Sequence, residues 1–141
     1  MVPETPTIET GVQVMFYDTD AAGVVHNLAY LRFIELARTQ LAEQLGLGLH
    51  EMTRTQRFPV VVRIEVDYKR PGVLGDHLIV RGRLDTVGRS RFWCVFEIVR
   101  PSDGMLLVTS RQTLAMVQMP AGKPVRLPAE WATCFAHLKD A

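Results

Sequence analysis

Hydrophobic and polar residues alternate along several stretches of the chain, and this period of two predicts β-strands. The clearest alternation runs from Phe58 to Arg70, where apolar residues from Val60 to Tyr68 alternate with mostly charged ones. One face of this strand is therefore expected in the core. The same pattern predicts four further strands, at Ile8 to Phe16, 77–87, 91–99 and Met105 to Met119. Turn residues such as Pro71-Gly72 separate the later strands, and consecutive strands joined by short turns favour an antiparallel sheet.

A helical period appears between Tyr30 and Leu45, where apolar residues recur every three or four positions. This spacing predicts a helix of about eighteen residues, ended by Gly46 and Gly48. Apolar residues spread over much of its surface, which favours burial against a curved sheet. A short amphipathic helix is predicted over 131–138, after Pro128. The order of elements indicates an α+β fold with a long helix packed on an antiparallel sheet.

The composition describes an ordinary globular chain. With 141 residues, 48% hydrophobic and 22% charged, we expect a single domain over 1–141. The formal charge of +1 gives no reason to expect nucleic-acid binding. The N-terminus has no signal-peptide pattern, and no apolar run approaches the ~18 residues that span a bilayer, so we expect a cytoplasmic protein without stable membrane insertion. Cys94 and Cys134 show no metal-ligand spacing with histidine and are expected as buried thiols.

The segment between the first strand and the long helix contains the residues best suited to catalysis. Gly23 lets the backbone turn sharply, and a helix start presents free N–H groups that can stabilise an oxyanion. Asp20, seven residues before Asn27, can present a carboxylate to a carbonyl carbon as nucleophile or as general base. Asp18 and Asp20 also fit roles as turn or cap residues. A calcium loop is not predicted, because Ala29 stands where a carboxylate is required.

The run Asp-Thr-Asp-Ala-Ala-Gly-Val-Val, followed by Tyr30 and the helix, resembles the signature of the hotdog-fold acyl-CoA thioesterases. The nearest branches are the 4-hydroxybenzoyl-CoA thioesterases and the thioesterases associated with the Tol–Pal cluster. The turn from Arg70 to Asp76 and the tail from Leu127 to Trp131 are also similar. The resemblance implies a hotdog fold, an antiparallel sheet wrapped around a long central helix. It implies hydrolysis of an acyl-CoA or aroyl-CoA to free acid and coenzyme A, without a metal or another cofactor. It further implies a homodimer or a homotetramer built as a dimer of dimers, with sites between subunits.

The same resemblance assigns roles to individual residues. Asp20 matches the catalytic carboxylate, and the main-chain N–H of Asn27 matches the donor to the thioester oxygen. The Tol–Pal branch usually carries a histidine at position 27, whereas here His26 lies one residue earlier. Glu35 is a second candidate acid, since some relatives place the carboxylate on the central helix; flanked by Arg32 and Arg38, it also fits a structural ion pair. The expected substrate-binding residues are Gly23, His26, Tyr30 and Phe58, with Arg89 and Arg91 on the coenzyme A phosphates.

Two other functions fit the same residues. The chain can be a non-catalytic acyl-CoA binder, or a hotdog enzyme that acts on acyl-carrier-protein thioesters or enoyl thioesters. The sequence leaves the acyl group open between aromatic and short or medium aliphatic types.

Overall fold

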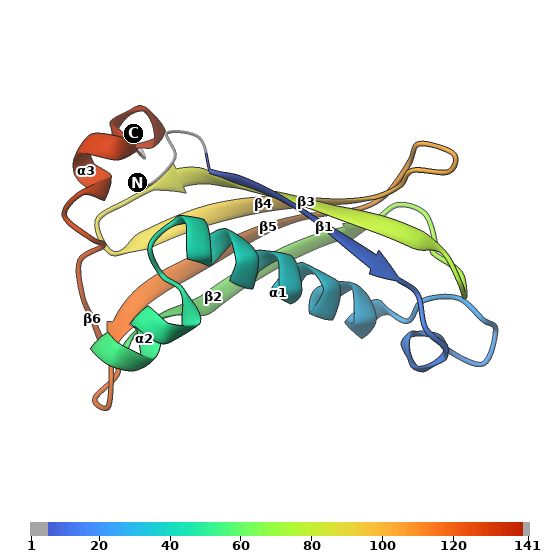
Figure 1. The fold of residues 1–141 in the computed structure, drawn as a ribbon, viewed down its shortest axis with the longest axis horizontal. Coiled ribbons are helices and arrows are strands. Elements are labelled where there is room, and N and C mark those ends of the chain that lie inside the picture. Colours follow the sequence, from blue (N-terminus) through green and yellow to red (C-terminus); the bar gives the residue numbers. More distant parts are fainter. Residues whose placement is uncertain (1–5, 140–141) are drawn as a thin grey trace.

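A computed structural model describes residues 6–139, and in it a curled antiparallel sheet packs on one long helix (Figure 1). The strand order is β1-β3-β4-β5-β2, with β6 paired to the end of β5. This arrangement confirms the α+β class. The strands are β1 (Thr7–Gln13), β2 (Arg57–Tyr68), β3 (His77–Val87), β4 (Arg91–Arg100), β5 (Met105–Gln118) and β6 (Lys123–Pro124). The α-helices are α1 (Asn27–Gln44), α2 (Leu49–Thr55) and α3 (Trp131–Cys134), with 3₁₀ turns at Phe16–Asp18 and Ala136–Leu138.

The core lies between α1 and the concave side of the sheet. Ile34, Ala37 and Leu41 of α1 are fully buried, as are Val80 and Ile98 from the sheet. Burying one large aliphatic side chain contributes about 1.5–3 kcal/mol, so this layer supplies much of the stability. α1 packs mainly on β1 and β3, which leaves the side of the sheet formed by β2 less covered.

β2 forms one edge of the sheet. The prediction that one face of this strand lies in the core is wrong for the isolated chain. Every residue of β2 is exposed or half-buried, and Val60, Val62 and Ile64 are 38–45% exposed. The pairing with β5 shifts between Val61 and Arg63, so a bulge at Val62 interrupts the alternation that the sequence suggests. The edge therefore exposes several apolar side chains together with unpaired backbone groups.

Three other boundaries differ from the sequence-based prediction. The first strand stops at Gln13, because the backbone of Met15 bonds to both the carboxylate and the N–H of Asp18 and forms a 3₁₀ turn. Phe16 consequently points away from the core, 82% exposed. The chain also folds into α2, which buries none of its residues fully and so gives no strong periodic signal. The C-terminal helix ends at Cys134 and continues as a 3₁₀ turn.

Candidate active site

Asp20 lies at the start of a tight turn in the loop between β1 and α1. Its N–H donates to the Val24 carbonyl at 2.9 Å, and its carbonyl accepts the Gly23 N–H at 3.0 Å. Gly23 has φ +76°, a conformation that side chains disfavour, so glycine suits this turn. One carboxylate oxygen, Oδ1, accepts the Ala22 N–H at 2.9 Å, and the side chain is exposed to solvent. The backbone of the acid is thus fixed while its carboxylate stays accessible.

Asn27 is the first residue of α1, and its N–H lies at the positive end of the helix. Within residues 6–139 no protein atom accepts a hydrogen bond from this N–H, and the cap residue His26 makes no side-chain cap bond. A cavity of about 320 Å³ opens beside Asn27, between Tyr30 of α1 and Tyr68 at the end of β2. The Tyr68 hydroxyl donates to the Asn27 carbonyl at 3.3 Å. A donor for a carbonyl oxygen is therefore available next to the Asp20 turn.

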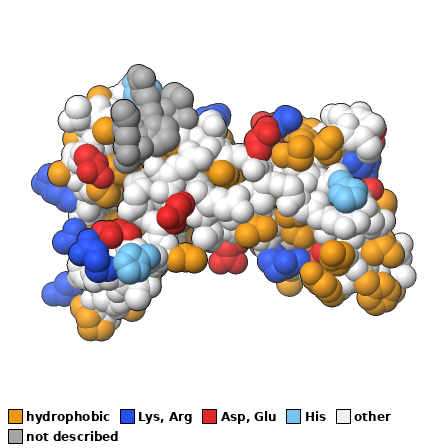
Figure 2. Space-filling view, in the orientation of Figure 1, with side chains coloured by type: hydrophobic (Ala, Val, Ile, Leu, Met, Phe, Trp, Pro, Cys, Tyr) orange, Lys and Arg blue, Asp and Glu red, His pale blue; other side chains and the backbone are white. Residues whose placement is uncertain are grey.

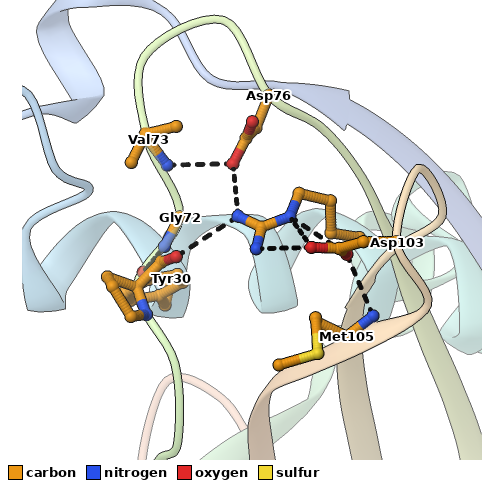
Figure 3. Close-up of polar contacts among 8 residues, drawn as sticks. Tyr30, Gly72, Val73, Asp76, Asp103 and Met105 are labelled. Carbon is orange, nitrogen blue, oxygen red and sulfur yellow. Dashed lines mark hydrogen bonds and ion pairs between the residues drawn. The ribbon is translucent and has the colours of Figure 1, made fainter.

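The turn at 71–76 forms hydrogen bonds with the loop that carries Asp20, residues 14–26 between β1 and α1, which we call the acid loop. Val25 donates to the Gly72 carbonyl at 2.9 Å, and Leu74 donates to the Gly23 carbonyl at 3.0 Å. Gly72 in turn donates its N–H to the buried Tyr30 hydroxyl at 2.8 Å (Figure 3). Burial raises the pKa of Tyr30, so this hydroxyl is neutral near pH 7.

Arg100 links the same turn to the hairpin between β4 and β5. Its guanidinium lies 2.9 Å from Asp76 and 2.9 Å from Asp103, and these hydrogen bonds raise the pKa of Arg100. It also donates to the Pro71 carbonyl at 3.4 Å. Figure 3 shows Asp76 bonded to Val73 and Asp103 bonded to Met105, so the whole turn is anchored by charge-assisted bonds.

The remaining carboxylates near this loop have structural partners. Asp18 is 2% exposed and forms an ion pair with Arg32 of α1. Asp18 thus supports the loop, as expected, and Arg32 is engaged there rather than with Glu35. Glu35 is 66% exposed and lies 3.7 Å from Arg38, its one ion-pair partner among the described residues.

Phe58, Arg89 and Arg91 lie far from Asp20 within one chain. Tyr68 contacts Asn27, and Phe58 lies ten residues earlier on β2, about 33 Å away along an extended strand. Arg89 and Arg91 lie at the turn between β3 and β4, at the α3 end of the molecule, opposite the acid loop (Figure 1). Within one protomer, the predicted acid and oxyanion site therefore lies far from the predicted phosphate-binding residues.

A basic cavity of about 670 Å³ surrounds Arg89. Arg126 and Lys139 also line it, and Trp131 forms part of its wall. The Trp131 indole N–H is buried without a hydrogen-bond partner among the described residues. Sequence reasoning identified Arg89 and missed Arg126 and Lys139, because only the fold brings the three cations together. This cavity suits a phosphate group, since guanidinium and ammonium groups both bind phosphate oxygens.

A second cavity, of about 220 Å³, lies between α1, α2 and the sheet. Its walls are mostly apolar, with Leu45, Met52 and Leu114 among them, but Arg38 and Glu35 also line it. The sequence pattern gave Arg38 no role beyond an ion pair, because its partner Gln112 is 74 residues away on β5.

Exposed apolar side chains gather at the end of the molecule that carries the acid loop. Figure 2 shows this concentration at the right-hand end of the view. The exposed residues include Phe16, Tyr17 and Leu28, which are 63–82% accessible, and Val73 and Leu74 of the anchoring turn. Such a patch is typical of a surface that meets a ligand or another chain.

Residues 6–139 contain no cluster of three or more potential metal ligands. Over the same residues, none of the helices is long and apolar enough to cross a membrane.

Comparisons with known proteins agree with the fold. Residues 14–135 match the thioesterase-like superfamily. The acyl-CoA thioesterase YbgC of Haemophilus influenzae is 32% identical over 129 residues, covering 91% of this chain and 93% of that protein. A 1,4-dihydroxy-2-naphthoyl-CoA hydrolase of Synechocystis is 28% identical over 127 residues, covering 89% of this chain and 92% of that protein. Among solved structures, a 1,4-dihydroxy-2-naphthoyl-CoA thioesterase from Synechocystis superposes with a TM-score of 0.81 at 26% identity, covering 94% of this chain and 97% of that one. The chain therefore belongs to the thioesterase-like superfamily, which confirms the expected hotdog fold and the class of thioester hydrolase.

Proposed function

We propose that the chain hydrolyses acyl-CoA thioesters, with Asp20 acting on the carbonyl carbon and the Asn27 N–H binding the carbonyl oxygen. One observation supports this most directly. An accessible carboxylate held by the Asp20–Gly23 turn and an N–H without a protein acceptor lie at the same junction of loop and helix. The relatives named above are thioesterases that act on CoA thioesters.

The reaction needs only these two groups. Asp20 either attacks the carbonyl carbon or takes a proton from a water that attacks it. Both routes place negative charge on the carbonyl oxygen, which the Asn27 N–H and the helix dipole stabilise by a few kcal/mol. Collapse of this intermediate breaks the C–S bond and releases the CoA thiolate. In the nucleophilic route a water then hydrolyses the acyl-Asp20 anhydride and regenerates the carboxylate.

The coenzyme would be held by its phosphates in the basic cavity around Arg89. Arg126 and Lys139 line the same cavity, so three cations converge on one site. Arg91, the other expected phosphate ligand, lies two residues further along, at the start of β4, and can contact the outer part of the same anion.

The distance between the Asp20 and Asn27 site and the basic cavity around Arg89 is explained if the active unit is a dimer. β2 is an edge strand with exposed Val60, Val62 and Ile64, so it can pair with β2 of a second copy and cover these side chains. An antiparallel pair about a two-fold axis reverses the strand, so the Phe58 end of one chain lies beside the Tyr68 end of the other. Asp20 of each chain would then face the Phe58 side of its partner.

The proposal is tested by measuring thiol release from a panel of acyl-CoA esters, with aromatic and with short or medium aliphatic acyl groups. Each ester is compared with the matching N-acetylcysteamine thioester, which lacks the nucleotide and its phosphates. Wild-type protein should hydrolyse both, with a lower KM for the CoA ester. Arg89→Ala should raise KM for the CoA ester and leave the truncated ester unchanged. Arg81→Ala, a change in an exposed arginine of β3 outside the proposed interface, is the control and should affect neither. Saturable binding of acyl-CoA without thiol release would instead identify a non-catalytic binder.

A further inference from the structure

Arg38 is a partly buried cation in a mostly apolar cavity. Its side chain is only 19% exposed, and the cavity that it lines between α1, α2 and the sheet is otherwise formed by apolar side chains, with Glu35 and Thr39 as the other polar residues. Burial lowers the pKa of Arg38, although a guanidinium stays charged at neutral pH. Placing a charge in such surroundings is costly unless polar groups compensate for the lost water.

The protein satisfies this guanidinium incompletely. Arg38 donates one hydrogen bond, from Nη1 to the Gln112 side-chain oxygen at 2.6 Å. Glu35 lies 3.7 Å from Nη2, which is beyond hydrogen-bonding distance, and its carboxylate is well solvated. Gln112 is itself 1% exposed, and among the described residues its side chain forms hydrogen bonds only with Arg38 and Ser110. A guanidinium carries five N–H donors, so a residue that lines the cavity and makes one hydrogen bond among the described residues has further donors to offer a ligand.

We propose that this cavity receives the acyl group of the thioester and that Arg38 selects acyl groups with a carboxylate at the far end. This inference rests on the proposed function, because it names the substrate class of the same site. The apolar walls suit a short methylene chain or one aromatic ring, since a cavity of about 150 Å³ is known to hold benzene and this one measures about 220 Å³. The free N–H groups suit a carboxylate, which guanidinium binds in bidentate fashion.

The position of the cavity fits a site shared between two chains. Pro59, next to Phe58 at the start of β2, lines it. In the two-fold pairing of β2 described above, this end of one chain lies beside Asp20 of the partner. Within one chain, Arg38 lies eleven residues beyond Asn27, about 17 Å along the helix axis. The acyl carbon at Asp20 of one protomer can thus direct its chain into the Arg38 cavity of the other.

The test compares three matched pairs of CoA esters that differ in the end group: hexanoyl and adipoyl, octanoyl and suberoyl, and benzoyl and 4-carboxybenzoyl. In wild-type protein at least one carboxylate-bearing ester should have a kcat/KM about 10- to 100-fold above its partner. At 1.4 kcal/mol per tenfold, this equals about 1.4–2.8 kcal/mol, the range for a hydrogen bond to a charged group. Arg38→Met should abolish that preference while retaining hydrolysis of the uncharged ester, and Arg38→Lys should keep part of it.

Arg54→Met is the matched control, because Arg54 lies on the neighbouring helix α2, is exposed and pairs with Glu51. This variant should keep the wild-type preference. A wild-type preference that survives Arg38→Met, or the absence of a carboxylate preference in all three pairs, would overturn the inference while leaving thioester hydrolysis intact. Failure to hydrolyse any of the six esters would overturn the proposed function itself.

Discussion

The hydrogen bond from Gly72 to Tyr30 is a sharp test of how the acid loop is held. Tyr30→Phe removes the hydroxyl that accepts the Gly72 N–H at 2.8 Å and leaves this buried donor without a partner. The ring keeps its contacts with Phe33 and Tyr68, at centroid distances of 6.4 and 5.7 Å, so little packing is lost. An unsatisfied buried donor costs about 1–3 kcal/mol.

The expected effect is large enough for a thermal melt. For a chain of this size, 1 kcal/mol lowers Tm by roughly 3–5 °C, so Tyr30→Phe should lower Tm by roughly 3–15 °C. Melting should be followed by circular dichroism at one fixed protein concentration, because an oligomer's Tm depends on concentration. At temperatures well below its Tm, the variant should also have a lower kcat than wild type. Gly72 accepts the Val25 N–H and so positions the loop that carries Asp20.

Tyr68→Phe is the matched control for this substitution. Its hydroxyl is solvent-exposed and makes a long 3.3 Å bond to the Asn27 carbonyl, so its loss should change stability by no more than about 0.5 kcal/mol. The reasoning is refuted if Tyr30→Phe has the same Tm as wild-type protein, or if Tyr30→Phe and Tyr68→Phe lower the stability by the same amount.

Two further predictions concern the loop glycine and the thiols. Gly23→Ala should cost about 1–2 kcal/mol in chemical denaturation, because φ is +76° although an added Cβ meets nothing within 4 Å; Gly11→Ala, equally open and without a positive φ, should cost less, and equal costs would contradict the strain argument. Burial raises the pKa of the Cys94 thiol to about 12, so at pH 8 native protein should react with Ellman's reagent at Cys134 alone and unfolded protein at both thiols. Rapid reaction of two thiols in the native state would show that the core around Cys94 opens.

The sequence predicted the elements whose residues carry a strong local period. The helix from Asn27 to Gln44 and the strands from His77 to Gln118 lie close to the predicted positions, because each buries one regular face. The prediction failed at β2, where the same alternation is present but no layer of this chain covers it. A bulge at Val62 cannot be read from the pattern, since it depends on the register with β5.

In the candidate site, too, the features set by neighbouring residues could be predicted and those set by distant segments could not. Asp20, Gly23 and Asn27 are close in sequence, so their turn-and-helix arrangement could be predicted locally. The Arg38 cavity and the cluster of Arg89 with Arg126 depend on residues brought together from distant segments. Nothing in the local spacing of those arginines distinguishes them from other surface charges.

The most direct test of the central claim is the kcat/KM for thiol release by Asp20→Asn, measured beside wild type on the best ester of the panel. The substitution keeps the size of the side chain and an acceptor for the Ala22 N–H, so fold and acyl-CoA binding should be retained. Loss of the nucleophile or base should lower kcat/KM by at least about 100-fold. Glu97→Gln, a change in an exposed carboxylate of β4 away from the proposed interface, is the control and should retain wild-type turnover. Near-wild-type turnover by Asp20→Asn would show that another group performs the chemistry and would contradict the account.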